Sequence, residues 1–395
     1  MTRDPALVAE SRALKAALDR FPTLAALRAA PEYPALRARL AALLGTVRRH
    51  APPAAPAPPA DPARVRAVHW NIEHGNWYAQ VEDALLRHPA LAGADLVMLN
   101  EIDFGMARAA NRDVTGDLVA ALGLHGVWAP LFLETTVGRD DDPVTAAGRD
   151  NEEALFGLAI LARWPIGEVR VLELPSPEAL QFDLERMAGR HIALIAEVLR
   201  PGAPFVAVSA HLEVHRTRAD RARQVRVLMQ ALAGERRPVI LAGDFNSHTF
   251  DRGLWHSPIT GGASLLVWPG PWLRRRLLWP DRGPFRETLF DVLRAHGFAW
   301  EPWVDRAPTL RLRLERLDEV RALPAALRRR AAPLLRWAER RGALRLDWFA
   351  GRGWSHAHAA PGAHGRTVEG LDGPGRASDH APIVAEFAGP AATSG

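Results

Sequence analysis

Polar side chains that can bind a metal ion or activate water stand at the ends of apolar segments in this 395-residue chain. The clearest case is PVILAGDFN (238–246), in which Asp244 and Asn246 follow the apolar run VIL. Such a run predicts a strand covered on both faces, and alternate residues of an extended chain point to the same side. Because Asp, Asn and Gly also favour turns, a turn and a ligand site are both open interpretations of this segment.

Comparable polar residues mark the ends of other apolar segments. They are Asn71 after VRAVHW, Glu101 after DLVMLN, His211 after FVAVSA, Asp347 within LRLDWF, and Asp379 and His380 just before APIVAEF. One such residue is explained by a cap or a turn, but their repetition predicts a common site. Carboxylate and amide oxygens suit Mg²⁺, and two imidazoles can transfer protons near neutral pH. The pattern therefore predicts metal-assisted hydrolysis of a phosphoester.

A family resemblance supports this interpretation. The segments HWNIEHG, VMLNEID, FGLAILARWPI, GRHIALIAEV, VSAHLE, VILAGDFN, RLDWF and SDHAPI resemble, in this order, the motifs of the endonuclease/exonuclease/phosphatase superfamily. They cover residues 64–387 apart from 250–342, where only LFDVLRAHGF and PTL look familiar. The resemblance implies an α/β fold, a four-layer α-β-β-α sandwich of two mixed sheets with helices outside. It also implies hydrolysis of a phosphodiester or phosphomonoester by a metal-bound water.

The resemblance assigns metal ligands residue by residue. Glu101 would be the main ligand of Mg²⁺, with Mn²⁺ as an alternative, and Asn71 and Asp379 would lie close to the metal.

The same resemblance assigns the residues that act on water and phosphate. Asp244 would orient and deprotonate the attacking water, and Asn246 would donate to a phosphoryl oxygen. His380 would contact the phosphate, with Asp347 fixing its tautomer through a carboxylate–imidazole hydrogen bond. His211 would be the second histidine, polarising the phosphate or assisting the leaving group.

Three residues near these motifs leave alternatives open. The sequence does not identify the carboxylate partner of His211, for which Glu153 and Glu213 are candidates. Arg190, in AGRHIAL, either clamps a phosphate through its bidentate guanidinium or is structural. Arg108, in the polar loop after the metal-binding glutamate, is equally open between a structural and a functional role.

Composition and charge limit the classes of protein to which this chain can belong. A hydrophobic content of 48% and a charged content of 24% are typical of soluble globular proteins. The chain has no apolar run of the ~18 residues that a membrane span needs, and its first residues lack the apolar core of a secretory signal, which predicts a cytoplasmic location. Because the chain contains no cysteine, disulfides and thiolate metal sites are excluded. Because Lys15 is the only lysine, the net charge of +5 reflects a general arginine bias and is weak evidence for nucleic-acid binding.

Changes in composition divide the chain into parts. Residues 1–50 have helical spacing and are predicted to be an N-terminal helical extension, dispensable for chemistry. Residues 51–63, APPAAPAPPADPA, form a Pro/Ala linker. Residues 64–389 are the predicted catalytic domain, interrupted by a helical insertion at about 250–342, with helix breaks at Pro324 and Pro333.

The substrate depends on the insertion. A nuclease would use its arginines as a phosphate track. A sphingomyelinase-like phosphodiesterase would use Trp268, Trp272 and Trp279, beside the arginines of 274–276, for peripheral contact with a membrane. An inositol-type phosphatase would use the insertion as a lid. The tryptophans are equally consistent with a packed hairpin, and an inactive scaffold is a further class. Nothing in the sequence predicts an obligate protein partner.

Overall fold

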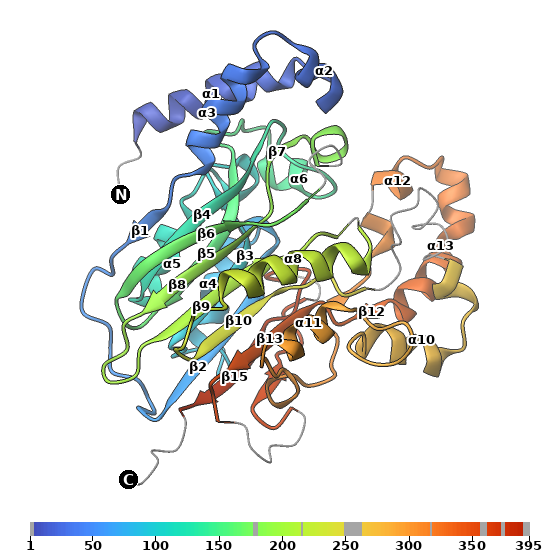
Figure 1. The fold of residues 1–395 in the computed structure, drawn as a ribbon. Coiled ribbons are helices and arrows are strands. Elements are labelled where there is room, and N and C mark those ends of the chain that lie inside the picture. The colour runs from blue at the N-terminus through green and yellow to red at the C-terminus, as the bar shows by residue number, and fades with distance from the viewer. Residues whose placement is uncertain are drawn as a thin grey trace.

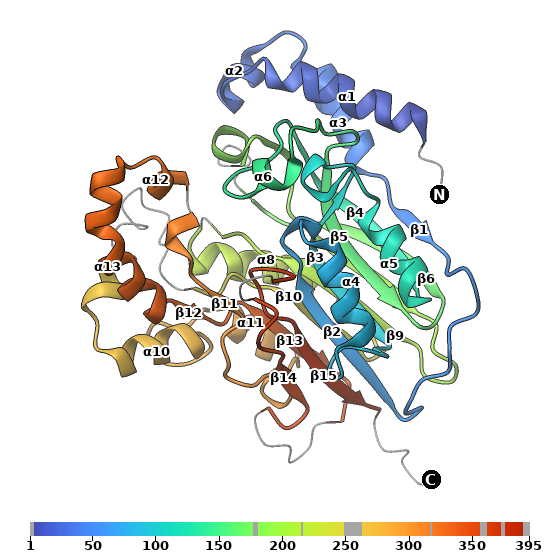
Figure 2. The ribbon, with the colours of Figure 1, turned by 180° about the vertical axis from the view of Figure 1, so that it is seen from behind.

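Two mixed β-sheets pack face to face, with helices against the outer face of each (Figure 1). The same layers are seen from behind in Figure 2. The structure is a computed structural model that describes residues 4–176, 181–214, 216–248, 263–316, 318–355, 362–372 and 376–389. The predicted four-layer sandwich is therefore confirmed.

The first sheet contains the strands that carry Asn71 and Glu101. In spatial order its strands are β1 (Arg48–His50), β4 (His125–Glu134), β5 (Leu155–Ala162), β3 (Leu96–Phe104), β2 (Arg64–Asn71), β15 (Ile383–Ala388) and β14 (Gly365–Thr367), with β7 (Met187–Gly189) paired to β4. Strands β2 and β3 run parallel, and the other neighbours are antiparallel.

The second sheet contains the strands that end in His211 and Asp244. Its order is β13 (Asp347–Arg352), β10 (Val239–Asp244), β9 (Phe205–His211), β8 (Ile192–Val198) and β6 (Ile166–Glu173). Strands β9 and β10 run parallel. Every residue of β10 is buried, as its uninterrupted apolar run predicts.

Three layers of apolar side chains hold the sandwich together. The layer between the sheets includes Ile160, Leu194, Ile240, Phe349 and Phe387, all of which are almost fully buried. A second layer lies between the first sheet and its helices, and a third lies between the second sheet and its helices. Burial of this apolar area is the main term favouring the fold.

Amphipathic helices cover the two outer faces. Helices α4 (Tyr78–Arg87) and α5 (Val114–Leu122) pack on the first sheet, and α8 (Arg218–Ala231) and α11 (Leu289–Ala295) pack on the second. Thr217 caps α8 in a reciprocal capping box with Asp220, as its sequence position predicts. The short helical segments are η1 (Glu73–Gly75), η2 (Ala107–Ala109), α6 (Asp142–Ala146), η3 (Gln181–Glu185), η4 (Glu301–Trp303) and η5 (Leu314–Arg316).

The N-terminal residues pack against the first sheet. Helices α1 (Pro5–Asp19), α2 (Leu24–Ala29) and α3 (Tyr33–Leu44) contribute leucines to the same apolar layer as β3 and β5. The helical pattern expected up to residue 50 is wrong at its end, because α3 stops at Leu44 and residues 48–50 form β1 on the edge of β4. The linker boundary at 51–63 stays a prediction, but the shared core argues against a dispensable extension.

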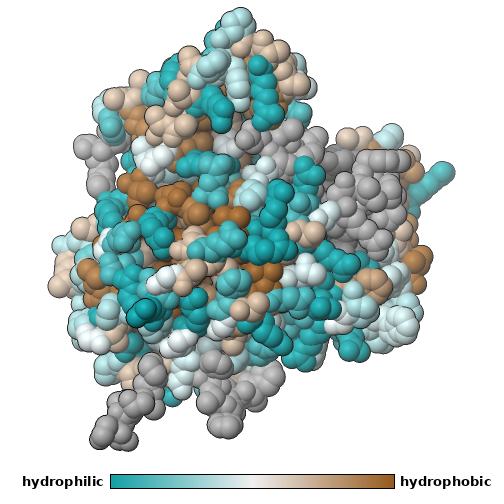
Figure 3. Space-filling view, in the orientation of Figure 1, coloured by the Kyte–Doolittle hydropathy of each residue, from teal (hydrophilic) through white to brown (hydrophobic). Residues whose placement is uncertain are grey.

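Apart from α11, which packs on the second sheet, much of the insertion forms a lobe beside the sandwich, at the right of Figure 1. It contains α10 (Gly270–Leu278), α12 (Asp318–Arg321) and α13 (Ala325–Arg341), with β11 (Leu310–Arg311) paired to β12 (Ala343–Leu344). Residues 264–280 are thus helical and not a hairpin. The break at Pro324 is confirmed, whereas α13 continues through Pro333. Residues 249–262 of the insertion lie outside the described residues. In Figure 3 the outer edge of this lobe carries both apolar and polar surface.

No helix in the described part of the chain combines the length and the apolar character needed to cross a membrane.

Removing residues 1–60 should destabilise the protein, because the truncation exposes the apolar side chains under α3 and leaves β4 without its β1 partner. We expect a lower melting temperature or insoluble protein. In the full chain, Leu43→Ala, at a buried position, should cost about 2–5 kcal/mol in the free energy of unfolding. Arg37→Ala, at an exposed position of the same helix, is the matched control. An unchanged melting temperature in the truncated protein would contradict this packing.

Candidate active site

The register of the second sheet brings three predicted site residues side by side. Asp244 on β10 is paired with His211 on β9 and with Asp347 on β13. Gly243 permits this approach, because a Cβ atom at that position would lie 1.8 Å from the carbonyl oxygen of Ala210. The predicted convergence at strand ends therefore arises from pairing within one sheet.

The first sheet supplies the opposite wall of the site. Asn71 ends β2, and Glu101 lies in an irregularity of β3 with a φ angle of 53°. The Asn71 side-chain amide donates to Glu101 Oε1 at 2.8 Å and to Asp244 Oδ2 at 3.3 Å. Its oxygen accepts from the Glu73 backbone N–H at 3.2 Å. Asn71 thus orients Glu101 and joins the two sheets at the site.

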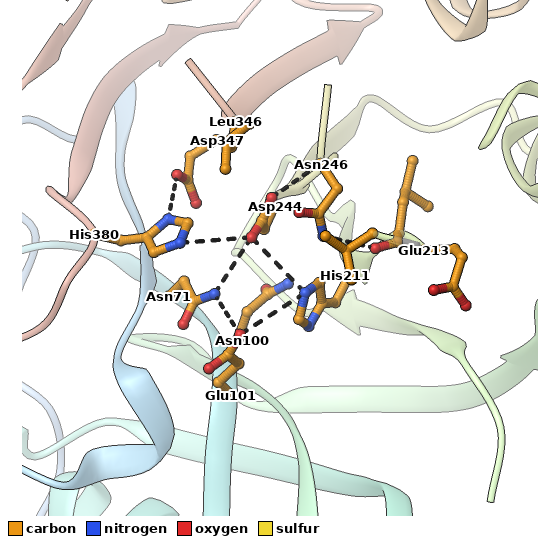
Figure 4. Close-up of polar contacts among 12 residues, drawn as sticks. Asn71, Asn100, Glu101, His211, Glu213, Asp244, Asn246, Leu346, Asp347 and His380 are labelled. Carbon is orange, nitrogen blue, oxygen red and sulfur yellow. Dashed lines mark hydrogen bonds and ion pairs between the residues drawn. The ribbon is translucent and has the colours of Figure 1, made fainter. Parts of the chain in front are cut away.

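The Asp244 carboxylate is the centre of the cluster (Figure 4). Its Oδ2 atom lies 3.7 Å from His211 Nε2 and 3.8 Å from His380 Nε2. Burial, followed by repulsion from Asp347, raises the pKa of Asp244 to about 6. A buried carboxylate between two imidazoles is suited to accept a proton from a bound water.

Asp347 fixes the orientation of His380. His380 Nδ1 lies 2.8 Å from Asp347 Oδ2, and His69 Nε2 lies 3.1 Å from Asp347 Oδ1. Burial alone would raise the pKa of Asp347, but the two histidines outweigh it and hold the pKa below its usual range. Burial opposes the charge on His380, yet Asp347, Asp379 and Asp244 raise the pKa of His380 well above its usual value. Asp347 and His380 therefore form the predicted pair.

His69 was not predicted as part of the site. It lies inside β2, is fully buried, and its Nδ1 atom lies 3.1 Å from the carbonyl oxygen of Met98. A buried histidine in an apolar strand, two residues before Asn71, was the available signal.

Hydrogen bonds hold the segment that carries Asp379 and His380. The Ser378 hydroxyl donates to the carbonyl oxygen of Asn71 at 2.7 Å and accepts from the His380 backbone N–H at 3.1 Å. The Trp70 indole donates to the carbonyl oxygen of His380 at 2.9 Å. The SDH segment is thus anchored to the end of β2, opposite Asp244.

The GDFN segment is both a turn and part of the site. Strand β10 ends at Asp244, and Asn246 has a φ angle of 47°, so the two side chains are not related by extended backbone. The Asn246 N–H donates to Asp244 Oδ1 at 2.9 Å, and its side-chain amide donates to the carbonyl oxygen of Leu212 at 2.8 Å. Both residues nevertheless line the same pocket.

Neither carboxylate considered for His211 pairs with its imidazole. Glu153 lies against Gly105, and Glu213 contacts His191 Nε2 at 3.2 Å. The carboxylates nearest to His211 Nε2 are Asp244 and Glu101, and its Nδ1 has no hydrogen-bond partner among the described residues. Burial, with the charges of His191 and His380, lowers the pKa of His211 to about 3, so its ring is neutral.

His191 and Glu213 form a second imidazole–carboxylate pair that the sequence did not reveal. His191 Nδ1 lies 3.1 Å from the carbonyl oxygen of His211, and the Gln181 amide donates to Glu213 at 2.6 Å. All three side chains are buried and line the pocket. The only sequence signal was that His191 directly precedes β8 and Glu213 closely follows β9, its antiparallel neighbour.

Arg190 and Arg108, whose roles were left open by the sequence, both make structural contacts. Arg190 does not line the pocket; its guanidinium donates to the carbonyl oxygen of Leu44 at 3.0 Å, at the end of α3. Arg108 is buried in ion pairs with Asp103 at 2.7 Å, Glu134 at 2.8 Å and Asp142 at 3.1 Å. It forms part of the pocket wall.

The pocket above this cluster has a volume of about 580 Å³ and an excess of carboxylates. Burial and then repulsion from Asp379 raise the pKa of Glu101 to about 8, and the same two causes raise that of Glu73 to about 7 despite its ion pair with Arg376. The repulsive part of these shifts comes from carboxylates that lie close together in the pocket. A divalent cation bound by hard oxygen donors would compensate this negative charge.

Two groups of side chains could hold such a cation. Asp244, Asp347 and His380 offer ligand atoms within 4.8 Å of one another. Each oxygen of Asp347, however, already faces a histidine nitrogen. Within the described part of the chain, Glu101 and Asp379 have no such imidazole partner at hydrogen-bond distance, and both line the pocket. The donor chemistry therefore fits a metal on the Glu101 side.

Fold and site together define a phosphoesterase of the α-β-β-α sandwich type. The family model described as "Endonuclease/Exonuclease/phosphatase family" matches residues 68–380, and the chain belongs to this family. Its members hydrolyse phosphoesters, so the chain is a phosphoesterase in general terms. No curated protein matches the chain.

Solved structures with a similar fold have low sequence identity. An endonuclease/exonuclease/phosphatase from Beutenbergia cavernae DSM 12333 is 16% identical, with 82% of this chain and 72% of that chain covered and a TM-score of 0.46. The human Nocturnin catalytic domain with bound sulfate is 14% identical, with 84% of this chain and 95% of that chain covered and a TM-score of 0.44. An AP endonuclease from Archaeoglobus fulgidus is 12% identical, with 82% of this chain and 99% of that chain covered and a TM-score of 0.44.

Arg108→Ala should destabilise the fold strongly, because it leaves Asp103, Glu134 and Asp142 buried without their counter-charge. We expect a loss of about 3–5 kcal/mol in the free energy of unfolding, measured by urea denaturation. Arg112→Ala, which removes a largely exposed pair with Asp117, should cost about 0–1 kcal/mol. Equal losses in the two variants would contradict the structural role of Arg108.

Proposed function

We propose that this chain is a divalent-metal-dependent hydrolase whose phosphoester substrate enters the pocket above Asp244. The observation that carries the proposal is the position of the Asp244 carboxylate between His211 and His380, with Glu101 beside it. A base, two imidazoles and a set of oxygen donors are thereby present within one pocket. This combination suits attack of water on phosphorus.

Glu101 and Asp379 are the residues that would hold the metal, and Asn71 keeps the Glu101 carboxylate in place. Their oxygen atoms favour Mg²⁺ or Mn²⁺. When bound, the ion would offset the charge of the carboxylates and of the phosphate and polarise a phosphoryl oxygen.

Asp244 is proposed as the base that orients and deprotonates the attacking water. One of its oxygens accepts from the Asn246 N–H, which leaves Oδ2 directed toward the two histidines and Asn71. Because the backbone fixes one oxygen, the other has a defined direction toward the pocket. Such preorganisation lowers the cost of positioning the water.

His380 is proposed to bind the phosphate as a cation. Asp347 lies on its Nδ1 side, so the Nε2–H points toward Asp244 and the pocket. An imidazolium held in this way can stabilise negative charge that develops on phosphoryl oxygens. His211 is neutral and can donate or accept a proton beside the same carboxylate.

The pocket favours a phosphoester carried by a compact group. Its volume is within the range typical of small-molecule sites. The rim is formed by the segment 139–142, by Met187 and Val214, and by residues 310–313 of the insertion. Phosphodiester and phosphomonoester substrates both stay open, as do nucleotide, lipid and inositol-type groups. A screen of these compounds with Mg²⁺, Mn²⁺ or EDTA is the experiment that tests the proposal, and inactivity toward all of them would support an inactive scaffold.

Glu101→Gln should reduce turnover by orders of magnitude and weaken metal affinity, because it removes a charged oxygen ligand while keeping the shape of the side chain. The measurement is the rate with the best substrate across a Mg²⁺ titration, together with calorimetric binding of Mn²⁺. Glu82→Gln, on the outer helix α4, is the control. Full activity of Glu101→Gln at limiting Mg²⁺ would overturn the metal assignment.

Asp347 and His380 should act as one unit in turnover. We expect Asp347→Asn and His380→Gln each to lower kcat by about 10²-fold or more. The double variant should lose little beyond the worse single variant, because each change disables the same imidazole. Circular dichroism and thermal unfolding would verify the fold, since Asp347 also contacts His69. A double variant whose loss equals the product of the two single losses would refute the coupling.

A further inference from the structure

The insertion lobe, defined as α10, α12 and α13, exposes large apolar side chains. Trp272 on α10 is 71% exposed, and Leu327, Leu334 and Trp337 on α13 are 50%, 53% and 44% exposed. Val267, just before α10, is 75% exposed. Exposed apolar groups gathered in one region mark an interaction surface more often than isolated ones do.

Helix α13 has an amphipathic pattern that its contacts with the protein do not explain. Of its 17 residues only Ala338 is buried. Leu327, Leu334 and Trp337 follow the spacing i, i+7, i+10, which places them on one stripe of the helix. Because a helix of this length gains most of its stability from packing of its apolar face, this stripe is a surface for an external partner.

The three tryptophans predicted to contact a membrane do not behave alike. Trp268 packs on Phe285 with ring centroids 6.1 Å apart, and the Arg276 guanidinium lies 4.9 Å from the centre of its ring. Trp279 is half-buried beneath Arg306, whose guanidinium lies 4.7 Å from its ring. Of the three, only Trp272 is exposed. It belongs with the α13 stripe to one packed unit, because α10 and α13 share the apolar cluster of Leu273, Leu277 and Ala338.

The same surface is strongly basic. The sequence of α13, AALRRRAAPLLRWAERR, contains six arginines and one glutamate, and α10, GPWLRRRLL, contains three arginines and no acidic residue. The guanidinium groups of Arg340 and Arg341 lie 5.8 Å and 5.0 Å from the centre of the Trp337 ring, so basic groups border the apolar stripe. Arginines beside tryptophan and leucine are characteristic of helices that lie in the headgroup region of anionic bilayers.

We propose that this surface docks on an anionic phospholipid bilayer, with Trp272, Leu334 and Trp337 entering the interface and the arginines contacting lipid phosphates. A nucleic acid is the less favoured partner, because a phosphate track requires the basic groups and leaves the exposed leucines and tryptophans without a role. The bilayer uses both kinds of side chain.

The surface is connected to the mouth of the pocket. The Leu312 N–H donates to the carbonyl oxygen of Gly342, just after α13, at 2.8 Å, and Leu310 to Arg313 line the pocket. Arg321 of α12 pairs with Asp141, which also lines the pocket. Docking would therefore bring the pocket mouth next to the bilayer. The docking itself does not depend on the proposed hydrolysis.

The test is flotation of the intact protein with vesicles of phosphatidylcholine alone or mixed with phosphatidylserine. We expect binding to the mixed vesicles that weakens as salt rises. The variant Trp272→Ser/Trp337→Ser should bind roughly tenfold more weakly or worse, from the apolar area lost. Leu86→Ser/Leu199→Ser, at positions 42% and 43% exposed outside the lobe, should bind like the unchanged protein. Circular dichroism and melting temperature would show that the fold is kept.

Several results would overturn the docking surface. These are no flotation with mixed vesicles at low salt, equal loss of binding in both double variants, or binding to single-stranded DNA that the tryptophan changes leave unaltered while vesicles are not bound. Dimerisation abolished by Trp272→Ser/Trp337→Ser, without vesicle binding, would assign the surface to a second copy of the chain. If vesicles are bound but no phosphoester is hydrolysed, the proposed function fails while the docking surface stands.

Discussion

The carboxylate of Asp347 is the group on which the arrangement of the site depends. It belongs to β13 of the second sheet, yet its two oxygens face His69 on β2 of the first sheet and His380 in the segment that leads into β15 of the same sheet. A buried carboxylate without such partners would be costly, so the two sheets are held at the offset that satisfies it. That offset also places His380 against Asp244 and Asn71 between Asp244 and Glu101. Packing between the sheets and geometry at the site are therefore set by the same contact.

The negative charge of the pocket is compensated unevenly between its wall and its floor. The charge of the wall is partly compensated, since Arg108 pairs with Asp103, Glu134 and Asp142 and Arg376 pairs with Glu73. The floor lacks this compensation, because no arginine among the described residues forms an ion pair with Glu101, Asp379 or Asp244. An anionic substrate would be repelled by such a floor unless a cation accompanied it. This difference between the wall and the floor explains how a site for a phosphoester can be built mainly from carboxylate side chains.

The sequence predicts the local parts of this structure better than the pairings. Asn71, Glu101, His211 and Asp244 were found because each ends an apolar run, and strand ends depend on nearby residues. His69 and His191 were missed because their roles depend on which distant strands become neighbours, which the chain does not reveal locally. Pro333 was expected to break a helix, but it lies on an exposed helix where the lost hydrogen bond can be replaced by water. The end of the N-terminal helical region was misplaced because three residues form an edge strand whose partner, β4, lies far along the chain.

The strand order of the first sheet determines which part of the site forms last during folding. β15 follows all other strands in sequence, yet it lies inside the first sheet, between β2 and β14. Until it is inserted, β2 lacks one neighbour and His380 is not anchored to the end of β2. During synthesis Asn71, Glu101 and Asp244 can thus assemble before Asp379 and His380, which arrive together just ahead of the last strand. Hydrolytic competence should then appear abruptly, as one of the last events of folding, and incomplete chains would carry no partial activity.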